Sequence, residues 1–119
     1  MMDMETTVME LIIQAGEARS CAMQALRAAR SYDWPEADRQ LAAATTAARA
    51  AHKIQTALIG ADEGVGKVPV NLILVHAQDH LINAMLCREL AEEIVILHRE
   101  MQALKQVKGN QPAPEAIRS

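Results

Sequence analysis

Residues 72–86 read L-I-L-V-H-A-Q-D-H-L-I-N-A-M-L, and this segment decides how the rest of the chain must be arranged. Its composition is that of an apolar helix, yet His76, Gln78, Asp79 and His80 fall within five residues at its centre. Burying a neutral polar group without a partner costs roughly 2–7 kcal/mol. We therefore expect these side chains to be paired or to form a working site, with His76 as its nucleophile.

The composition favours one all-α domain. Half of the 119 residues are hydrophobic, but there is no Phe, one Trp and one Tyr, so the core must be built from aliphatic residues and Ala. Such residues suit closely packed helices. The formal net charge is −3, with Lys and Arg scattered among Asp and Glu. Because there is no basic stripe and aromatic residues able to stack on bases are almost absent, nucleic-acid binding is not expected.

Neither the N-terminus nor the central apolar run predicts export or membrane insertion. The start, M-M-D-M-E-T-T, lacks the basic and apolar regions of a signal peptide. The apolar run over 68–78 is too short for a bilayer, which takes about 20 residues. We expect a cytoplasmic protein. Cys21 and Cys87 both fall in apolar helical runs, which favours buried free thiols over a disulfide or a metal pair.

Helical spacing of apolar residues predicts an antiparallel, up-down-up bundle of three helices. Thr7 and Glu10 have the spacing of a capping box at the first helix start, and Asp33 and Glu36 repeat it at the second. The second helix is expected to end near 59, and the third to run from about 69 to 107. Residues 1–107 then form one domain, and 108–119, with two prolines, a flexible tail.

Three further features concern packing. Gly16, inside the first helix, indicates either a close helix crossing or an opening beside a ligand. The glycine-rich segment 60–67 lacks the spacing of a phosphate-binding loop, and Pro69 follows its Lys, so that function is rejected. Trp34 is expected to seal the end of the bundle.

The third helix is apolar nearly all round between 68 and 86, so two partner helices cannot cover it. We expect its surplus face to meet other subunits in a homo-oligomer with this helix at the centre. Its later part is expected to turn four large apolar residues inward: Leu90, Ile94, Leu97 and Met101.

The polar cluster has three interpretations. At about 100° per residue, His76, His80 and Asn83 lie on one side of the helix, with Asp79 on a flank and Gln78 far away. They could be satisfied core residues. They could hold zinc, but Ala77 stands where the H-E-x-x-H pattern has its Glu. Or His76 could carry a phosphoryl group, with His80 donating to its oxygens.

Three blocks of sequence carry a family resemblance. In chain order they are L-I-I-Q-A-G-E-A-R-S (11–20), A-H-K-I-Q-T-A-L-I (51–59) and V-H-A-Q-D-H-L (75–81). This is the order found in one family. The chain resembles enzyme IIA of the lactose/cellobiose/chitobiose class of the bacterial phosphoenolpyruvate-dependent sugar phosphotransferase system. The chitobiose-type members are the most similar. Ile82-Asn83 departs from the commoner Met followed by Thr, which bears only on partner preference.

The resemblance implies a homotrimer and a phosphocarrier. His76 would accept a phosphoryl group on Nε2 from the carrier protein HPr and pass it to a cysteine of enzyme IIB. The group would end on a disaccharide of the chitobiose, cellobiose or lactose type, with the membrane involved only through the enzyme IIC permease. Gln78 and His80 match motif positions and could orient or contact the phosphoryl group.

The resemblance also implies that Asp79 meets its symmetry mates on the three-fold axis around a divalent metal, usually Mg²⁺. Three converging carboxylates repel each other, and a cation that prefers oxygen ligands relieves the repulsion. His52 and Gln55 belong to the block over 51–59. They either line a neighbouring part of the pocket or only pack against other residues.

Two rival functions remain open from the sequence. A non-enzymatic helical oligomer could use Asp79 and the histidines only to set its register. A histidine phosphotransfer domain of two-component signalling is closer in chemistry, but it is usually a four-helix bundle.

Overall fold

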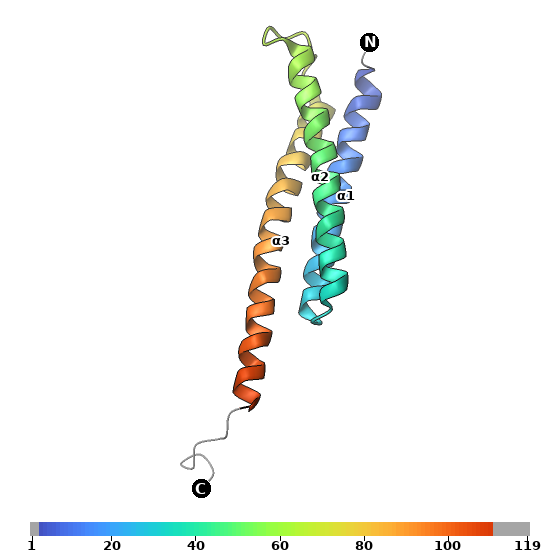
Figure 1. Cartoon of the computed structure of the whole chain (residues 1–119). Coiled ribbons are helices and arrows are strands. Elements are labelled where there is room, and N and C mark those ends of the chain that lie inside the picture. The colour runs from blue at the N-terminus through green and yellow to red at the C-terminus, as the bar shows by residue number, and fades with distance from the viewer. Residues whose placement is uncertain (1–2, 111–119) are drawn as a thin grey trace.

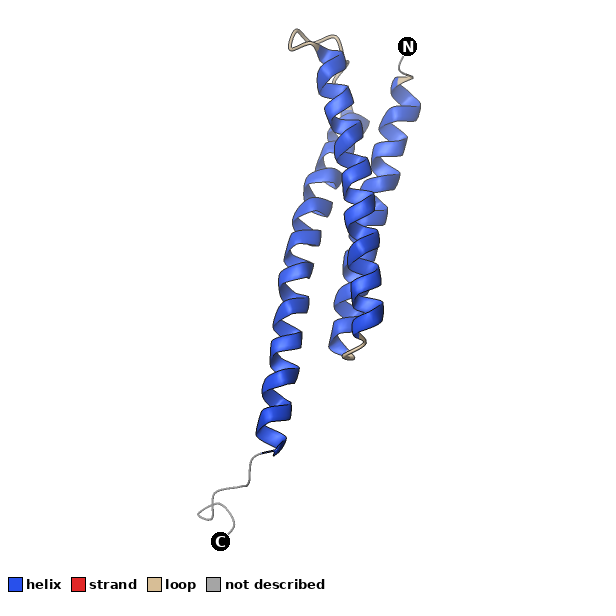
Figure 2. Cartoon of the chain, viewed as in Figure 1, coloured by secondary structure: helices blue, strands red, loops and turns tan. Residues whose placement is uncertain are grey.

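The computed structural model describes residues 3–110, which form three helices: α1 (Met4–Arg30), α2 (Trp34–Asp62) and α3 (Leu72–Asn110). No strand occurs within this range (Figure 2). In Figure 1 the chain runs down α1, up α2 and down again as α3, which continues beyond the α1–α2 turn. The prediction of an all-α, up-down-up bundle is confirmed. Most of the predicted tail, residues 111–119, lies outside the described residues.

The start of α1 differs from the prediction. Asp3 precedes the helix, and its carboxylate accepts a hydrogen bond from the Thr6 hydroxyl at 2.6 Å. The Thr7 N–H donates to the Asp3 carbonyl at 2.9 Å, so Thr7 already lies inside the first turn. The predicted capping box at Thr7 and Glu10 is therefore wrong, because the helix begins at Met4, three residues before Thr7.

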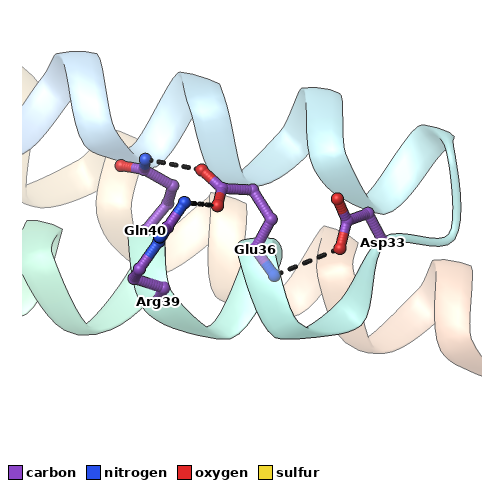
Figure 3. A network of polar contacts seen from close by, with 4 residues as sticks. All are labelled: Asp33, Glu36, Arg39 and Gln40. Carbon is purple, nitrogen blue, oxygen red and sulfur yellow. Dashed lines mark hydrogen bonds and ion pairs between the residues drawn. The ribbon is translucent and has the colours of Figure 1, made fainter.

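The start of α2 follows the prediction in part. The Asp33 carboxylate accepts from the Glu36 N–H at 3.3 Å, which satisfies one of the unpaired donors of a helix start (Figure 3). Pro35 occupies the first turn, where a missing N–H costs nothing. The Glu36 side chain does not complete the box. It binds Arg39 and Gln40 one turn along the helix instead (Figure 3).

The carboxylate of Asp62 organises the loop between α2 and α3. It accepts hydrogen bonds from the N–H groups of Val68 at 3.0 Å and Gly66 at 3.4 Å. Gly64 and Gly66 have φ angles of 71° and 80°, which glycine adopts without steric cost. The second helix thus ends three residues later than expected, at the residue that holds the loop together.

Both ends of α3 lie further along the chain than predicted. The Asn71 side chain caps the helix by accepting from the Leu74 N–H at 3.1 Å. Pro69 lies before this cap, in the link from the loop, so the expected start near Pro69 is wrong. The helix continues through Asn110, three residues past its predicted end at about 107.

Small side chains form most of the contacts between the helices. Within residues 3–110, Leu11 is the only large side chain that is fully buried, and its cluster holds Val8, Leu58, Leu74 and Leu81 beside two alanines. The other buried clusters consist mainly of alanines. Alanine lets helix backbones approach closely but contributes little apolar area. On α3 the buried residues are Leu74, Ala77, Leu81, Ala84, Ala91 and Val95.

Trp34 closes the lower end of the bundle, as predicted. Its indole N–H donates to the Gln102 side chain at 2.8 Å, and the Arg99 guanidinium lies 4.9 Å from the centre of its ring. These contacts join the start of α2 to the later part of α3. Beyond them α3 continues without a partner helix of its own chain (Figure 1).

The outer side of α3 corrects one prediction. Leu90, Ile94, Leu97 and Met101 are 52, 37, 55 and 48% exposed, so they do not face inward. The reason is that Ala91 and Val95, on the other side of the helix, make the contact with α1 and α2. None of the helices within residues 3–110 combines the length and apolarity needed to cross a membrane.

These outward residues belong to a continuous line, which we call the α3 seam. Its members are all exposed and recur every three or four residues, the spacing of a coiled-coil contact. They are Leu72, His76, Asp79, Asn83, Leu86, Leu90, Ile94, Leu97, Met101 and Leu104.

The most deeply buried large residue, Leu11, gives a direct test of the bundle. Leu11→Ala should lower the free energy of unfolding by about 2–5 kcal/mol, because it removes buried methyl groups and leaves a cavity beside Leu58, Leu74 and Leu81. Urea denaturation at one fixed protein concentration measures the change. Ile59→Ala, at an exposed position, should change it by no more than about 0.5 kcal/mol. Equal losses in the two variants would contradict this packing.

Candidate functional site

One surface pocket brings together the polar residues of the α3 seam. His76, Asp79, His80 and Asn83 line it from α3, and Arg19 lines it from α1. The pocket has a volume of about 420 Å³. Four of these five residues come from two turns of one helix, and the fifth comes from a helix packed beside it. The pocket is thus polar, while the seam above and below it is apolar.

His76 and His80 lie one turn apart and touch edge to face. Their ring centroids are 4.6 Å apart, and the ring planes are inclined by 77°. His76 is exposed and His80 is half-buried. An exposed imidazole can be approached by a group on another protein, and a neighbouring ring N–H can donate to that group. This pair suits transfer of an anionic group to His76.

Gln78 lies outside this pocket. It points to the opposite side of α3, where its amide donates to the Gln55 side-chain oxygen of α2 at 2.5 Å. Both side chains line a second pocket, next to Leu58 and Leu74. Within one chain, Gln78 and Gln55 therefore join α3 to α2 and do not reach His76.

His52 also lies elsewhere. It lines a groove between α2 and α3 together with Arg49, Lys53 and Arg88. This groove opens on a different side of α3 from the seam, as the separate sets of lining residues show. For His52 and Gln55 the sequence left pocket lining and simple packing both open, and in a single chain neither residue shares the pocket with His76.

Asp79 is exposed on the seam, one turn from Asn83 and next to His80. Within residues 3–110, no three side chains of His, Cys, Asp or Glu gather closely enough to hold a metal ion. In a single chain, Asp79 is the one carboxylate on the α3 seam. A metal held by Asp79 would need carboxylates from further copies of the chain.

Gly16 opens a space rather than permitting a close crossing. A Cβ atom added there would meet nothing within 4 Å, so the interpretation as a tight helix contact is wrong. Gly16 instead lines a shallow pocket that includes Arg19, Ser20 and His80. This pocket adjoins the one around His76, because Arg19 and His80 line both.

Arg19 is the residue of this pocket that the sequence did not single out. It belongs to the block over 11–20, but nothing in that block shows which helix face meets α3. Its neighbour Ala18 is fully buried, so Arg19 lies at the edge of the α1 contact. The only hint in the sequence was that Arg19 stands next to the apolar face of the first helix. This hint identifies a site residue only when the packing of α1 against α3 is known.

Both cysteines are free thiols. Cys21 is buried and Cys87 half-buried, so full burial holds for only one of the two. Burial raises the pKa of the Cys21 thiol above its ordinary value. The Glu17 carboxylate, which accepts from this thiol at 3.4 Å, raises the pKa further. Cys21 is therefore a poor nucleophile near neutral pH.

Comparison with known sequences identifies one family. The family model described as "PTS system, Lactose/Cellobiose specific IIA subunit" matches residues 6–99. The N,N'-diacetylchitobiose-specific EIIA component of Escherichia coli K12 is 46% identical over 101 residues, covering 85% of this chain and 87% of the relative. The lichenan-specific enzyme IIA component of Bacillus subtilis 168 is 40% identical over 99 residues, covering 83% and 90%.

Solved structures agree with this result. The cellobiose-specific enzyme IIA of Bacillus anthracis superposes with a TM-score of 0.81 at 39% identity, covering 87% of this chain and 94% of that one. The chitobiose IIA protein of Escherichia coli, solved in complex with HPr, gives a TM-score of 0.74 at 43% identity, covering 86% and 99%.

The bond between Gln78 and Gln55 can be tested by a double-mutant cycle. Gln55→Ala and Gln78→Ala should each lower the free energy of unfolding by about 0.5–1.5 kcal/mol, because each leaves a half-buried amide without its partner. The double variant should lose less than the sum of the two. Chemical denaturation measures all three, with Gln24→Ala on the exposed face of α1 as control. Additive losses would show that the two amides do not interact.

Proposed function

The chain belongs to the lactose/cellobiose-specific IIA family of the sugar phosphotransferase system, and on this premise we propose that it carries a phosphoryl group on His76. The observation that carries the proposal is the exposed His76 imidazole, which contacts His80 edge to face. Both histidines lie in the block over 75–81, one of the three blocks that resemble the family. Components of this family are phosphotransferases. The rival interpretations, a purely structural oligomer and a two-component phosphotransfer domain, do not fit this family membership.

The proposed transfer needs few chemical groups. An unprotonated ring nitrogen of His76 attacks the phosphorus of a phosphohistidine on the donor, forming one N–P bond as the other breaks. The electron pair of the broken bond returns to the donor imidazole. In the second transfer a cysteine thiolate attacks the same phosphorus, an S–P bond forms, and the electron pair of the N–P bond returns to His76. Positioning and charge stabilisation are then the protein's main contributions.

The partners follow from the family. We propose HPr as the donor, supported by the solved complex of the Escherichia coli chitobiose relative with HPr. The acceptor is a cysteine of enzyme IIB, and the final acceptor is a disaccharide of the chitobiose, cellobiose or lactose type. The chain would work in the cytoplasm and meet the membrane only through the enzyme IIC permease. An exposed His76 can be reached by both protein partners in turn.

The α3 seam supports assembly as a homotrimer around α3. Large apolar side chains at coiled-coil spacing rarely stay in water, and a continuous line of them marks an interface. The seam lies on the side of α3 that α1 and α2 leave uncovered. Parallel copies packed along it would bring Leu86, Leu90 and Leu97 into a common core. The polar pocket around His76 would then border this interface.

Asp79 fits a role at the centre of that trimer. It sits on the seam between His76 and Asn83, so three copies would direct three carboxylates toward one axis. Carboxylate oxygens are the ligands that Mg²⁺ prefers, and such an ion would neutralise their mutual repulsion. Asp79 of each subunit would hold the ion, and His76 would carry out the transfer. The metal has a structural role in this scheme.

His76→Ala should abolish phosphorylation. After incubation with phosphoenolpyruvate, enzyme I and HPr, intact-mass spectrometry should show one acid-labile phosphoryl group on the wild type and none on the variant. His98→Ala is the matched control, about 33 Å further along α3, and should be phosphorylated like the wild type. A wild-type chain that gains no mass, while a known IIA protein does in the same mixture, would overturn the proposed function.

Asp79→Leu should strengthen the trimer and remove its dependence on metal. Replacing buried charges with apolar side chains is often stabilising, here by about 1–4 kcal/mol. Thermal unfolding with EDTA and with MgCl₂ should differ for the wild type but not for the variant, and His76 should still be phosphorylated. Glu100→Leu, outside the seam, should keep the wild-type response. Loss of phosphorylation with an unchanged trimer would show that Asp79 acts in the transfer itself.

A further inference from the structure

Arg19 is the one permanently positive side chain of the pocket around His76. The other residues that line this pocket are Asp79, with a negative charge, the two histidines, and the neutral Asn83. Arg19 takes part in none of the four ion pairs found within residues 3–110. It forms no ion pair with Asp79, although both residues line the same pocket. A guanidinium in this situation is available to an anion.

The position of Arg19 along α1 suits contact with His80 and His76. Ala18 packs in the same cluster as Ala84, which places this turn of α1 beside the turn of α3 that follows His80. Long side chains on a helix lean back toward the N-terminus, over the residues three and four positions earlier. Arg19 therefore leans from the level of Ala84 toward the level of His80.

Gly16 lies at the place over which Arg19 leans. Because a Cβ there would meet nothing within 4 Å, packing of the single chain does not require glycine at this position. Glycine inside a helix costs about 0.5–1 kcal/mol relative to Ala. Because Gly16 has no side chain, a space lined by Arg19 and His80 stays open beside it. That space lets the guanidinium lie close to the imidazole pair.

The chemistry of phosphoryl transfer requires such a group here. The oxygens of a phosphoryl group need donors, and the backbone N–H groups in the middle of α3 are already paired within the helix. The donors must therefore be side chains. Arginine presents a planar fork of N–H groups that matches phosphate oxygens, and its charge offsets the repulsion from Asp79.

We infer that Arg19 binds the phosphoryl oxygens during transfer to and from His76, in the space that Gly16 leaves open. This inference rests on the proposed function and adds a second chain segment to its site. Arg19 donates hydrogen bonds to the oxygens of the moving group. The N–P bonds form and break as in the transfer described above.

Three variants measure this contribution. Arg19→Gln keeps much of the side-chain length but removes the charge and the fork, Arg19→Lys keeps the charge, and Arg30→Gln makes the same charge change about 16 Å further along α1. In rapid-quench assays with phospho-HPr, Arg19→Gln should slow phosphorylation of His76 by about 100-fold. Arg19→Lys should recover most of this loss, and Arg30→Gln should match the wild type.

A small donor separates phosphoryl binding from protein docking. Phosphoramidate gives its phosphoryl group to an imidazole nitrogen and releases ammonia, without HPr. Arg19→Gln should slow this reaction by a factor similar to that seen with phospho-HPr, with helicity and melting temperature unchanged. A defect with phospho-HPr alone would make Arg19 a docking residue and overturn the inference.

The remaining outcomes separate this inference from the proposed function. If wild-type His76 is phosphorylated and Arg19→Gln reacts at the rate of Arg30→Gln, the inference about Arg19 fails while the phosphocarrier role stands. If both Gln and Lys at position 19 lower the melting temperature and the rate together, Arg19 has only a structural role, and the inference fails again. If wild-type His76 is phosphorylated by neither donor, the proposed function itself fails.

Discussion

The structure depends on one constraint: α3 has apolar side chains on two sides, and its own chain can cover only one of them. The covered side is narrow and contains Ala77, Ala84 and Ala91, which let α1 and α2 pack closely. The uncovered side is the α3 seam, with large residues such as Leu86, Leu90 and Leu97. The larger apolar surface therefore faces away from the chain's own core. The proposed trimer resolves this imbalance by turning three seams toward one another.

The same constraint places the functional site. The seam is apolar except at His76, Asp79 and Asn83, so the polar interruption falls where the proposed copies would meet. Asp79 and His76 then have different tasks, one at the axis and one at its margin. Arg19 reaches this margin from α1, because the alanine contact holds α1 and α3 close together at that level. In the proposed scheme, assembly and phosphoryl transfer therefore use the same two turns of α3.

Features that are local in sequence could be predicted, and features that depend on packing could not. The three helices, the Asp33 cap and the separation of Gln78 from His76 follow from spacing alone. The inward side of α3 was predicted wrongly at Leu90 and Ile94, because both sides of this helix are apolar and periodicity cannot rank them. Arg19 was missed for a related reason: its place beside His80 depends on how α1 packs against α3.

The most direct test of the central claim is the mass of the assembly in solution. Sedimentation equilibrium at micromolar concentrations, with Mg²⁺ present, should give a single species of three times the 13.0 kDa chain mass. That result is expected if the α3 seam is the interface that completes the site around His76. A helical, well-folded monomer under these conditions would contradict the claim, because the seam would then be stable in water without a partner.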